Sequence, residues 1–147
     1  MKPTCVAPFE MTVRVKPEDI DPLGHVNNVV YLRWAQEVAV AHWQAHAPAE
    51  AQARLVWVVL RHEVDYKHPA RPGDTVKLRT WVGAASRFRF ERFTEMTRAP
   101  DGRLLAHVRT LWCPLDRATG RLAEVGSEVR SLFSTGAGPV RVQREPV

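Results

Sequence analysis

The feature that most constrains the fold is a continuous segment from Asn28 to His46 that contains neither proline nor glycine. Asn27 or Asn28 can cap its start, because an asparagine oxygen accepts from the unpaired N–H groups of a first helical turn, and Pro48 follows its end. Drawn as a helix, the segment is apolar on two opposite sides, with Val30, Trp34, Val38 and Ala41 on one and Leu32, Ala35, Ala39 and Trp43 on the other. A helix that is apolar around most of its circumference is buried, so the sequence predicts a sheet wrapped around it.

Five segments outside this helix are predicted to be strands, because they are rich in β-formers, alternate apolar and polar side chains, or are bounded by turn residues. They are residues 11–16, 58–67, 75–84, 87–97 and 104–114. A two-residue turn at Ala85-Ser86 joins the third strand to the fourth, and residues 123–133 form a short helix. This order predicts an α+β fold with one helix on a single antiparallel sheet. The sheet has exposed edges, so edge pairing in a dimer is expected.

The chain has 147 residues, the size of one domain with a substantial core, and we expect that core to span about residues 10–133. Residues 134–147 contain Gly136, Gly138 and Pro139 and are predicted to be a flexible tail. The net charge of +5 favours an anionic partner, but the basic residues are scattered among acids and no nucleic-acid-binding motif is present. A phosphate-bearing small molecule fits the charge better than a nucleic acid does.

The remaining composition excludes several classes of protein. Cys5 and Cys113 lack the spacing of metal ligands, so we expect two reduced thiols in a cytoplasmic protein and neither a disulfide framework nor a structural metal. No secretory signal is present, and no apolar run approaches the ~18 residues that span a bilayer. The sequence therefore predicts no membrane partner.

Polar residues are concentrated in residues 19–28, directly before the predicted helix. This loop carries Asp19, Asp21, His25, Asn27 and Asn28 around a Pro-Leu-Gly turn. Such a group of residues contributes little to a core, whereas a carboxylate, an imidazole and a helix N-terminus together suit acid–base chemistry on an anionic intermediate. The loop is the candidate functional site.

The same residues resemble a known family. Residues 21–32 read Asp-Pro-Leu-Gly-His-Val-Asn-Asn-Val-Val-Tyr-Leu, residues 64–67 read Val-Asp-Tyr-Lys, and residues 69–74 read Pro-Ala-Arg-Pro-Gly-Asp. With the buried helix, these motifs resemble hot-dog-fold acyl-CoA thioesterases of the 4-hydroxybenzoyl-CoA thioesterase type, and the first motif also resembles plant acyl-carrier-protein thioesterases. In element order the resemblance covers about residues 10–133.

The resemblance implies a sheet of five or six antiparallel strands curled around the helix, and a homodimer or homotetramer with its active site at the subunit interface. It implies hydrolysis of an acyl thioester without a metal or redox cofactor. The residue at the position of Asp21 is the catalytic carboxylate of the family. Two other activities remain open at this point: a hot-dog enoyl-CoA hydratase or dehydratase, and a non-catalytic acyl-CoA binder.

Each residue of the loop has a chemical and a structural interpretation. Asp21 is a nucleophile or a general base, or else it only forms the turn before Pro22. The Asn28 N–H at the helix start is the candidate oxyanion-hole donor. His25 and Asn27 orient water or substrate, or else they only cap the helix and bond the loop. Asp19 is expected to be solvated or to bond the loop.

Substrate contacts are predicted from charge and from apolar faces. Cations for the phosphates of CoA are Lys67, Arg71, Arg87 and Arg89. The acyl pocket is assigned to Val30, Trp34, Val58 and Phe88, with Tyr31 of the first motif beside them. His62 is expected to be a core histidine, and Gln36 and Glu37 are expected to bond at a dimer interface.

Overall fold

The computed structural model describes residues 6–136. Their elements, in order, are β1 (Phe9–Arg14), a 3-10 turn (Pro17–Asp19), α1 (Asn28–His46), α2 (Ala49–Arg54), β2 (Leu55–Tyr66), β3 (Thr75–Ala85), β4 (Phe90–Arg98), β5 (Leu104–Asp116) and α3 (Ser127–Phe133).

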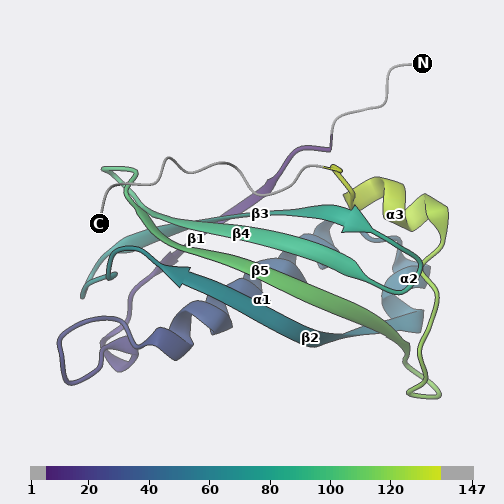
Figure 1. The fold of residues 1–147 in the computed structure, drawn as a ribbon, viewed down its shortest axis with the longest axis horizontal. Helices are drawn as coiled ribbons and strands as arrows, with labels where there is room; N and C mark the ends of the chain where they lie inside the picture. Colours follow the sequence, from purple (N-terminus) through teal and green to yellow (C-terminus); the bar gives the residue numbers. More distant parts are fainter. Residues whose placement is uncertain (1–5, 137–147) are drawn as a thin grey trace.

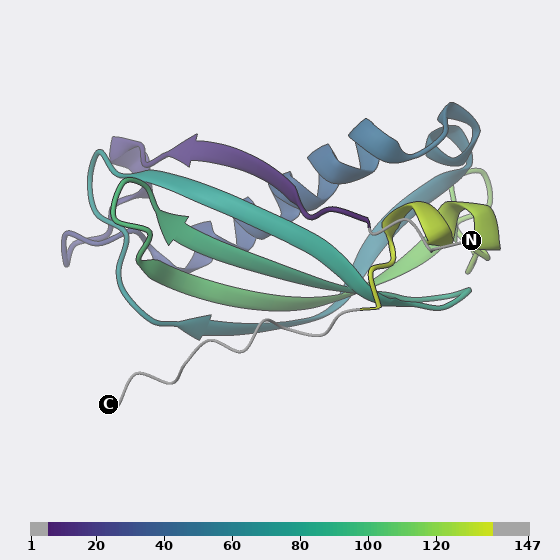
Figure 2. The ribbon, with the colours of Figure 1, turned by 90° about the horizontal axis from the view of Figure 1, so that it is seen from above.

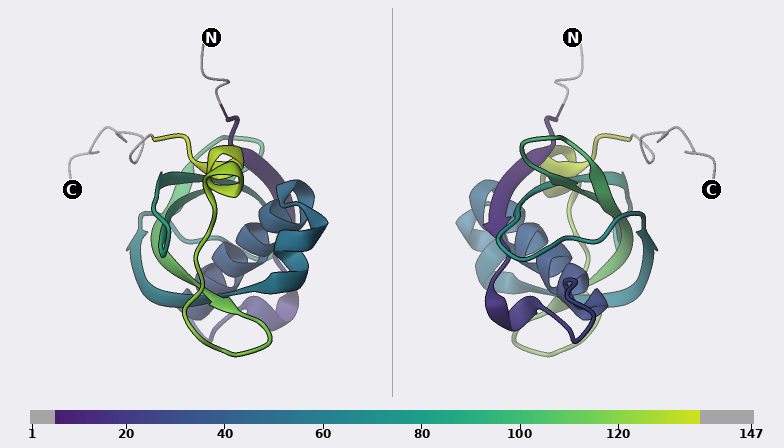
Figure 3. Two further views of the ribbon diagram at one scale, coloured as in Figure 1. Left: turned by 90° about the vertical axis from the view of Figure 1, so that its right-hand side faces the viewer. Right: turned by 90° about the vertical axis from the view of Figure 1, so that its left-hand side faces the viewer.

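The five strands form one antiparallel sheet in the order β1-β3-β4-β5-β2. The sheet curls around α1, which runs along its concave face (Figure 1, Figure 3). The predicted α+β hot-dog architecture is therefore confirmed, with five strands. β1 and β2 are the edges, and β2 is the longer of the two, with 12 residues against six.

The long helix begins and ends where the sequence predicts. Asn27 is its N-cap, since the Asn27 side-chain oxygen accepts from the Val29 N–H at 3.0 Å, and Ala47 is its C-cap, directly before Pro48. The side chains that α1 buries in the sheet are Val30, Tyr31, Trp34, Ala35, Val38, Ala39 and His42.

The core consists of two clusters under the two halves of α1. One lies under the N-terminal half and contains Tyr31, Trp34 and Met96. The other lies under the C-terminal half, where Leu55 and Phe133 are almost fully buried. The molecule therefore has two ends: the loop 19–28 lies at one, and α2 and α3 lie at the other (Figure 1, Figure 2).

The structure corrects three details of the predicted elements. The short helix α2 is absent from the sequence prediction, although its Ala-Glu-Ala-Gln-Ala-Arg sequence after Pro48 favours a helix. The connection from β3 to β4 covers residues 86–89 and is closed by a hydrogen bond from the Ser86 N–H to the Arg89 oxygen at 2.8 Å, so it is longer than the two-residue turn expected. The last helix starts at Ser127, later than predicted: Gly126 is its N-cap, and the N–H of Val125, before the cap, donates to the Arg87 oxygen at 2.8 Å.

A bulge in β2 corrects the face assigned to its residues. Val59 pairs with Trp112 and Arg61 with Leu111, so Leu60 is the extra residue. An extra residue reverses the alternation of side chains along the strand. Before the bulge the odd-numbered Trp57 points to the concave face, and after the bulge the even-numbered His62 points to that same face. Val58, for which simple alternation predicts the same face as His62, lies on the opposite face and is 38% exposed.

The chain from Ser134 is predicted to be a flexible tail, and its first residues differ from that prediction. Ser134, Thr135 and Gly136 bond the backbone of Val82 and Gly83, so the ordered chain continues past α3. Residues 137–147 of the predicted tail lie outside the described residues, as does Cys5.

Candidate active site

The helix-start loop, residues 19–28, holds Asp21 by one carboxylate oxygen. Asp21 Oδ1 accepts from the Leu23 N–H at 2.9 Å and from the His25 N–H at 3.3 Å, while the Asp21 N–H donates to the His25 oxygen at 2.8 Å. Oδ2 has no hydrogen-bond partner in the range 6–136. The carboxylate is thus oriented by its loop and still presents one oxygen outward.

The start of α1 lies on the same loop. Asn27 uses its side chain for the cap, and the N–H of Asn28 has no hydrogen-bond partner in the described part of the chain. A free N–H at the positive end of a 19-residue helix can stabilise an anion. His25 is exposed, and no hydrogen bond of its ring is seen among the described residues.

Asp19 anchors this loop, which is one of the two roles that the sequence allows for it. It is 1% exposed, and its two oxygens accept from the Arg33 guanidinium at 2.8 Å and from the Lys16 N–H at 3.0 Å. Burial alone would raise the pKa of Asp19, but these two hydrogen bonds and the charge of Arg33 lower it. Asp19 therefore bonds the loop to α1 as an anion and is not solvated.

Two tyrosines fix the neighbourhood of the loop. The Tyr66 hydroxyl donates to the Asn28 oxygen at 2.9 Å, which ties the end of β2 to the helix start. Burial raises the pKa of Tyr66, so this hydroxyl keeps its proton. The Tyr31 hydroxyl accepts from the Ala70 N–H at 2.9 Å, and the Val26 N–H donates to the Ala70 oxygen at 3.0 Å. Residues 68–74 are thereby held beside the helix-start loop.

The predicted phosphate-binding cations fall into two groups. Lys67 and Arg71 are exposed and lie at the helix-start end, on either side of the Ala70 that Val26 contacts. Arg87 and Arg89 lie in the connection between β3 and β4, at the end of the molecule that carries α3 (Figure 1). Arg87 pairs there with Glu124 at 3.6 Å, and its guanidinium lies over the exposed ring of Phe88. The chain by itself therefore does not bring all four cations to one site.

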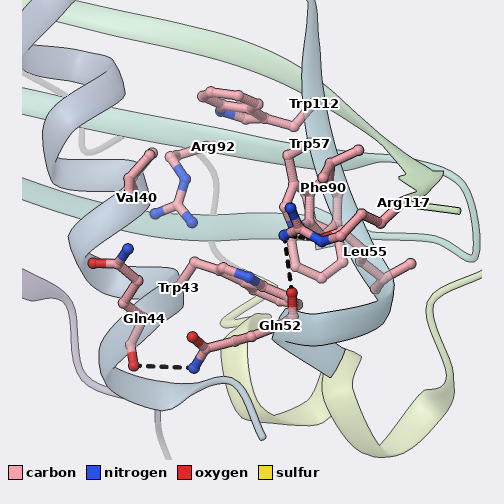
Figure 4. A pocket seen from close by; sticks show the side chains of 12 residues that line it. Val40, Trp43, Gln44, Gln52, Leu55, Trp57, Phe90, Arg92, Trp112 and Arg117 are labelled. Atoms are coloured by element: carbon pink, nitrogen blue, oxygen red, sulfur yellow. Dashed lines mark hydrogen bonds between the residues drawn. The ribbon is translucent and has the colours of Figure 1, made fainter. Parts of the chain in front are cut away.

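A cavity of about 260 Å³, which we call the aromatic cavity, opens at the α2 end (Figure 4). It is lined from five elements and the turn after β5, by Ala39, Val40, Trp43, Gln44, Gln52, Leu55, Val56, Trp57, Phe90, Arg92, Trp112 and Arg117. None of the residues assigned to the acyl pocket from the sequence lines it. Tyr31 and Trp34 are core residues with at most 2% exposure. Because of the bulge in β2, Trp57 rather than Val58 faces the cavity.

Neither a metal site nor a membrane-spanning helix is present within residues 6–136. No group of three or more histidine, cysteine, aspartate or glutamate side chains is placed there to hold a metal ion. No helix in that range combines the length and the apolar character that crossing a bilayer requires.

The curled sheet, the buried helix and the polar loop at its start define a hot-dog protein. Residues 15–133 match the sequence profile of the Thioesterase-like superfamily, and since the match covers most of the chain, the protein belongs to that superfamily. The resemblance found in the sequence is thus confirmed for the superfamily and the fold.

Solved structures and curated proteins agree with this assignment. A thioesterase from Thermus thermophilus, solved in complex with coenzyme A and Zn, is 27% identical, with a TM-score of 0.73 over 84% of this chain and 90% of that chain. A Staphylococcus aureus protein in complex with CoA superposes with a TM-score of 0.76 over 90% of this chain and 83% of that one, and at 18% identity it shows the fold alone.

Among curated proteins, the chloroplastic palmitoyl-acyl carrier protein thioesterase of Gossypium hirsutum is 27% identical over 104 residues, or 65% of this chain. The aligned region is 25% of that protein. The chain therefore spans about a quarter of the length of this curated relative.

Proposed function

We propose that this protein hydrolyses acyl-CoA thioesters, with the helix-start loop acting on the thioester carbonyl. The observation that carries the proposal is the pairing, on one loop, of an oriented carboxylate at Asp21 with an unbonded helix-terminal N–H at Asn28. Membership of the Thioesterase-like superfamily supports the same reaction.

Asp21 supplies the attack. Its Oδ2 either bonds to the carbonyl carbon directly, giving a mixed anhydride that water then opens, or takes a proton from the water that attacks. In both routes the carbonyl oxygen becomes an oxyanion, the C–S bond breaks, and the CoA thiolate leaves and is protonated. The loop bonds to Oδ1 hold the carboxylate in place throughout, so the turn-forming and catalytic interpretations of Asp21 are compatible.

The Asn28 N–H stabilises the oxyanion. In other enzymes one such donor is worth about 100- to 1000-fold in rate. The donor is a backbone group, so its contribution depends on the position of the helix start, which Asn27, Asp19 and Tyr66 fix by hydrogen bonds.

We further propose that the site is completed in a homodimer formed by two β2 edges. A twofold axis pairs identical strands antiparallel, so the Tyr66 end of one β2 lies beside the Leu55 end of the other. The Tyr66 end carries the helix start, and the Leu55 end carries the aromatic cavity. Pairing therefore brings the loop of one subunit to the cavity of its partner, and it brings Lys67 and Arg71 toward the other subunit's Arg87 and Arg89.

The test is release of thiol from a panel of acyl-CoA thioesters, followed with a thiol reagent, for the wild type and for Asp21→Asn. We expect the variant to lose at least about 100-fold in kcat, because the amide can neither attack nor accept the proton. Glu18→Gln is the matched control, since it removes one negative charge from an exposed position next to the same loop.

A folded Asp21→Asn enzyme with the wild-type rate contradicts the mechanism. Tight binding of acyl-CoA without thiol release in the wild type contradicts the proposed hydrolysis and indicates the non-catalytic binder instead. The same panel on acyl-carrier-protein thioesters distinguishes the two carriers.

A further inference from the structure

The aromatic cavity contains a charged group that has no countercharge. Arg92 is 5% exposed, and no carboxylate lies within ion-pair distance of it in the described range. Figure 4 shows its guanidinium in the cavity, between Val40 of α1 and the rings of Trp57 and Phe90. Burial lowers the pKa of Arg92 to about 9, so it is still a cation at neutral pH. Burying a charge costs free energy unless the charge is paired. An unpaired arginine in a cavity therefore indicates a binding site for an anionic group.

Arg92 is held rigidly by two neutral groups. Its Nη1 donates to His42 Nδ1 at 2.9 Å and to Thr80 Oγ1 at 3.1 Å. Because a guanidinium only donates, His42 Nδ1 must accept, and the ring proton is on Nε2. The arginine therefore bridges α1 and β3 while keeping its full charge.

The buried polar atoms around Arg92 that lack partners are all donors. Three of them, Arg92 Nε, Trp57 Nε1 and Trp112 Nε1, belong to residues that line the cavity, and the fourth, His42 Nε2, lies outside the lining on the ring whose Nδ1 accepts from Arg92. Buried donors normally find an acceptor, and an indole N–H seldom stays unbonded in an interior. A group of donors around one cation calls for a ligand that brings acceptor atoms and a negative charge, so a carboxylate fits it.

The walls of the cavity define the rest of the ligand. Trp43 and Trp57 meet edge to face with centroids 5.3 Å apart, and Trp57 lies 4.6 Å from Phe90. The volume of about 260 Å³ exceeds the ~150 Å³ of an engineered cavity that takes up benzene. Flat apolar walls of this size accept a substituted ring, and ring–ring contacts in this range of distances are favourable.

We propose that the aromatic cavity binds an aromatic carboxylate, with the ring packed against the wall formed by Trp43, Trp57 and Trp112 and the carboxylate on Arg92. Through the proposed function, on which this second step rests, the ligand is the acyl group of the substrate: a ring that bears a carboxylate remote from the thioester. Arg92 is then a specificity-determining residue and takes no part in bond cleavage.

The first experiment needs no turnover. Benzoate and benzamide, which have the same shape and differ in charge, are titrated against the wild type by calorimetry, with tryptophan fluorescence as a second readout. We expect benzoate to bind at least about tenfold more tightly than benzamide, because only benzoate pairs with the guanidinium. Equal binding of the two, or no binding of benzoate at millimolar concentration, overturns the proposal.

Variants locate the preference in the cavity. Arg92→Met should abolish the preference for benzoate over benzamide, and Arg92→Lys should keep part of that preference because it keeps the positive charge. Arg103→Met is the matched control, since it removes the same charge from an exposed position at the other end of the sheet. An equal loss in Arg103→Met contradicts the proposal. If Arg92→Met does not fold, Val40→Trp provides the test, because Val40 is 49% exposed on the cavity wall and a larger side chain there should fill part of the cavity and weaken benzoate binding while Arg92 itself is unchanged.

The second experiment separates this inference from the proposed function. It compares kcat/KM for para-carboxybenzoyl-CoA and para-methylbenzoyl-CoA, and we expect at least about a tenfold preference for the carboxylate that Arg92→Met removes. If the benzoate preference persists but neither these two thioesters nor any acyl-CoA of the panel is hydrolysed, the proposed function is contradicted and the carboxylate-binding site is supported. A persistent benzoate preference with equal hydrolysis of both contradicts the assignment of the cavity to the acyl group.

Discussion

The two ends of α1 differ in how they are assembled. The helix-start loop is a continuous stretch of the chain whose main contacts are hydrogen bonds to neighbours in sequence, such as the bonds from Leu23 and His25 to Asp21. The aromatic cavity combines side chains from α1, α2, β2, β4 and β5. Along the helix axis, Asn28 and Trp43 are separated by about 22 Å, at about 1.5 Å per residue.

In the function proposed above, this difference separates reaction from recognition. In the proposed reaction the loop offers groups that can act on any thioester carbonyl, a carboxylate and a backbone N–H, and none of its residues lines the aromatic cavity. The cavity offers shape and one buried charge, and it has no carboxylate among its lining residues. Changes at the cavity end should therefore alter stability and substrate choice, whereas changes at the loop end should alter rate.

Removal of Phe133 is expected to have the largest effect on stability. Phe133 is fully buried behind the cavity, stacked on Trp43 at 5.3 Å and edge to face with His42 at 4.9 Å. Phe133→Ala should lower the free energy of unfolding by about 3–5 kcal/mol, measured by urea titration. Leu132→Ala is the control, because Leu132 is 44% exposed on the same helix. An equally small effect of both changes would show that α3 does not support the cavity.

His42 should make stability depend on pH. Burial, then the charge of Arg92 and that of His46, lower the pKa of His42 to about 3, against 6.5 for a free histidine. Between these values the unfolded chain binds a proton that the folded chain does not, so acidification from pH 6.5 favours unfolding. The expected slope is about 1.4 kcal/mol per pH unit.

The measurement is urea unfolding at several pH values from about 7 down to about 5, for the wild type and His42→Gln, because the linkage slope develops below the pKa of the unfolded histidine. Burial also lowers the pKa of His62 and His107, so these residues contribute to both proteins and cancel in the difference. Parallel pH profiles for the two proteins would contradict a neutral, buried His42.

The anchor of the helix-start loop should have the smallest effect on stability. Asp19→Ala removes the acceptor of the Arg33 and Lys16 bonds and should cost about 1–2 kcal/mol. It should also reduce kcat, because the loop that carries Asp21 loses its attachment to α1. Glu10→Ala removes a half-exposed partner of Lys77 and should stay within about 0.5 kcal/mol with unchanged kcat. Unchanged kcat in Asp19→Ala would show that the loop keeps its position without this anchor.

The features that the sequence predicts correctly depend on local pattern. Asn27 and Pro48 mark the limits of α1, and the apolar character of both sides of α1 predicts its burial in a curled sheet. The helix-start loop is recognisable because its polar residues are consecutive in the chain. The resemblance to the hot-dog thioesterases rests on that same continuous stretch.

The features that the sequence does not reveal depend on long-range contacts. One extra residue at Leu60 reverses the alternation of β2 and places Trp57, rather than Val58, in the cavity. Arg92 lies in a strand that reads as ordinary alternation, and its lack of a carboxylate partner follows from what α1 and β3 place around it. A signal is present in the sequence, since Arg92 shares the period of the apolar Phe90 and Met96, but periodicity does not show what faces a buried charge.

The sequence by itself therefore determined the helix, the class of fold and the position of the helix-start loop, because these follow from propensity, capping and hydrophobic period over neighbouring residues. Only the tertiary structure decided where the ring-sized cavity lies, which face β2 turns toward it, and that its buried cation, Arg92, has no carboxylate partner among the described residues. Those properties arise from contacts between distant parts of the chain, such as the bond between Arg92 and His42, which are 50 positions apart. No local pattern encodes such contacts, because they form only when the sheet closes around the helix.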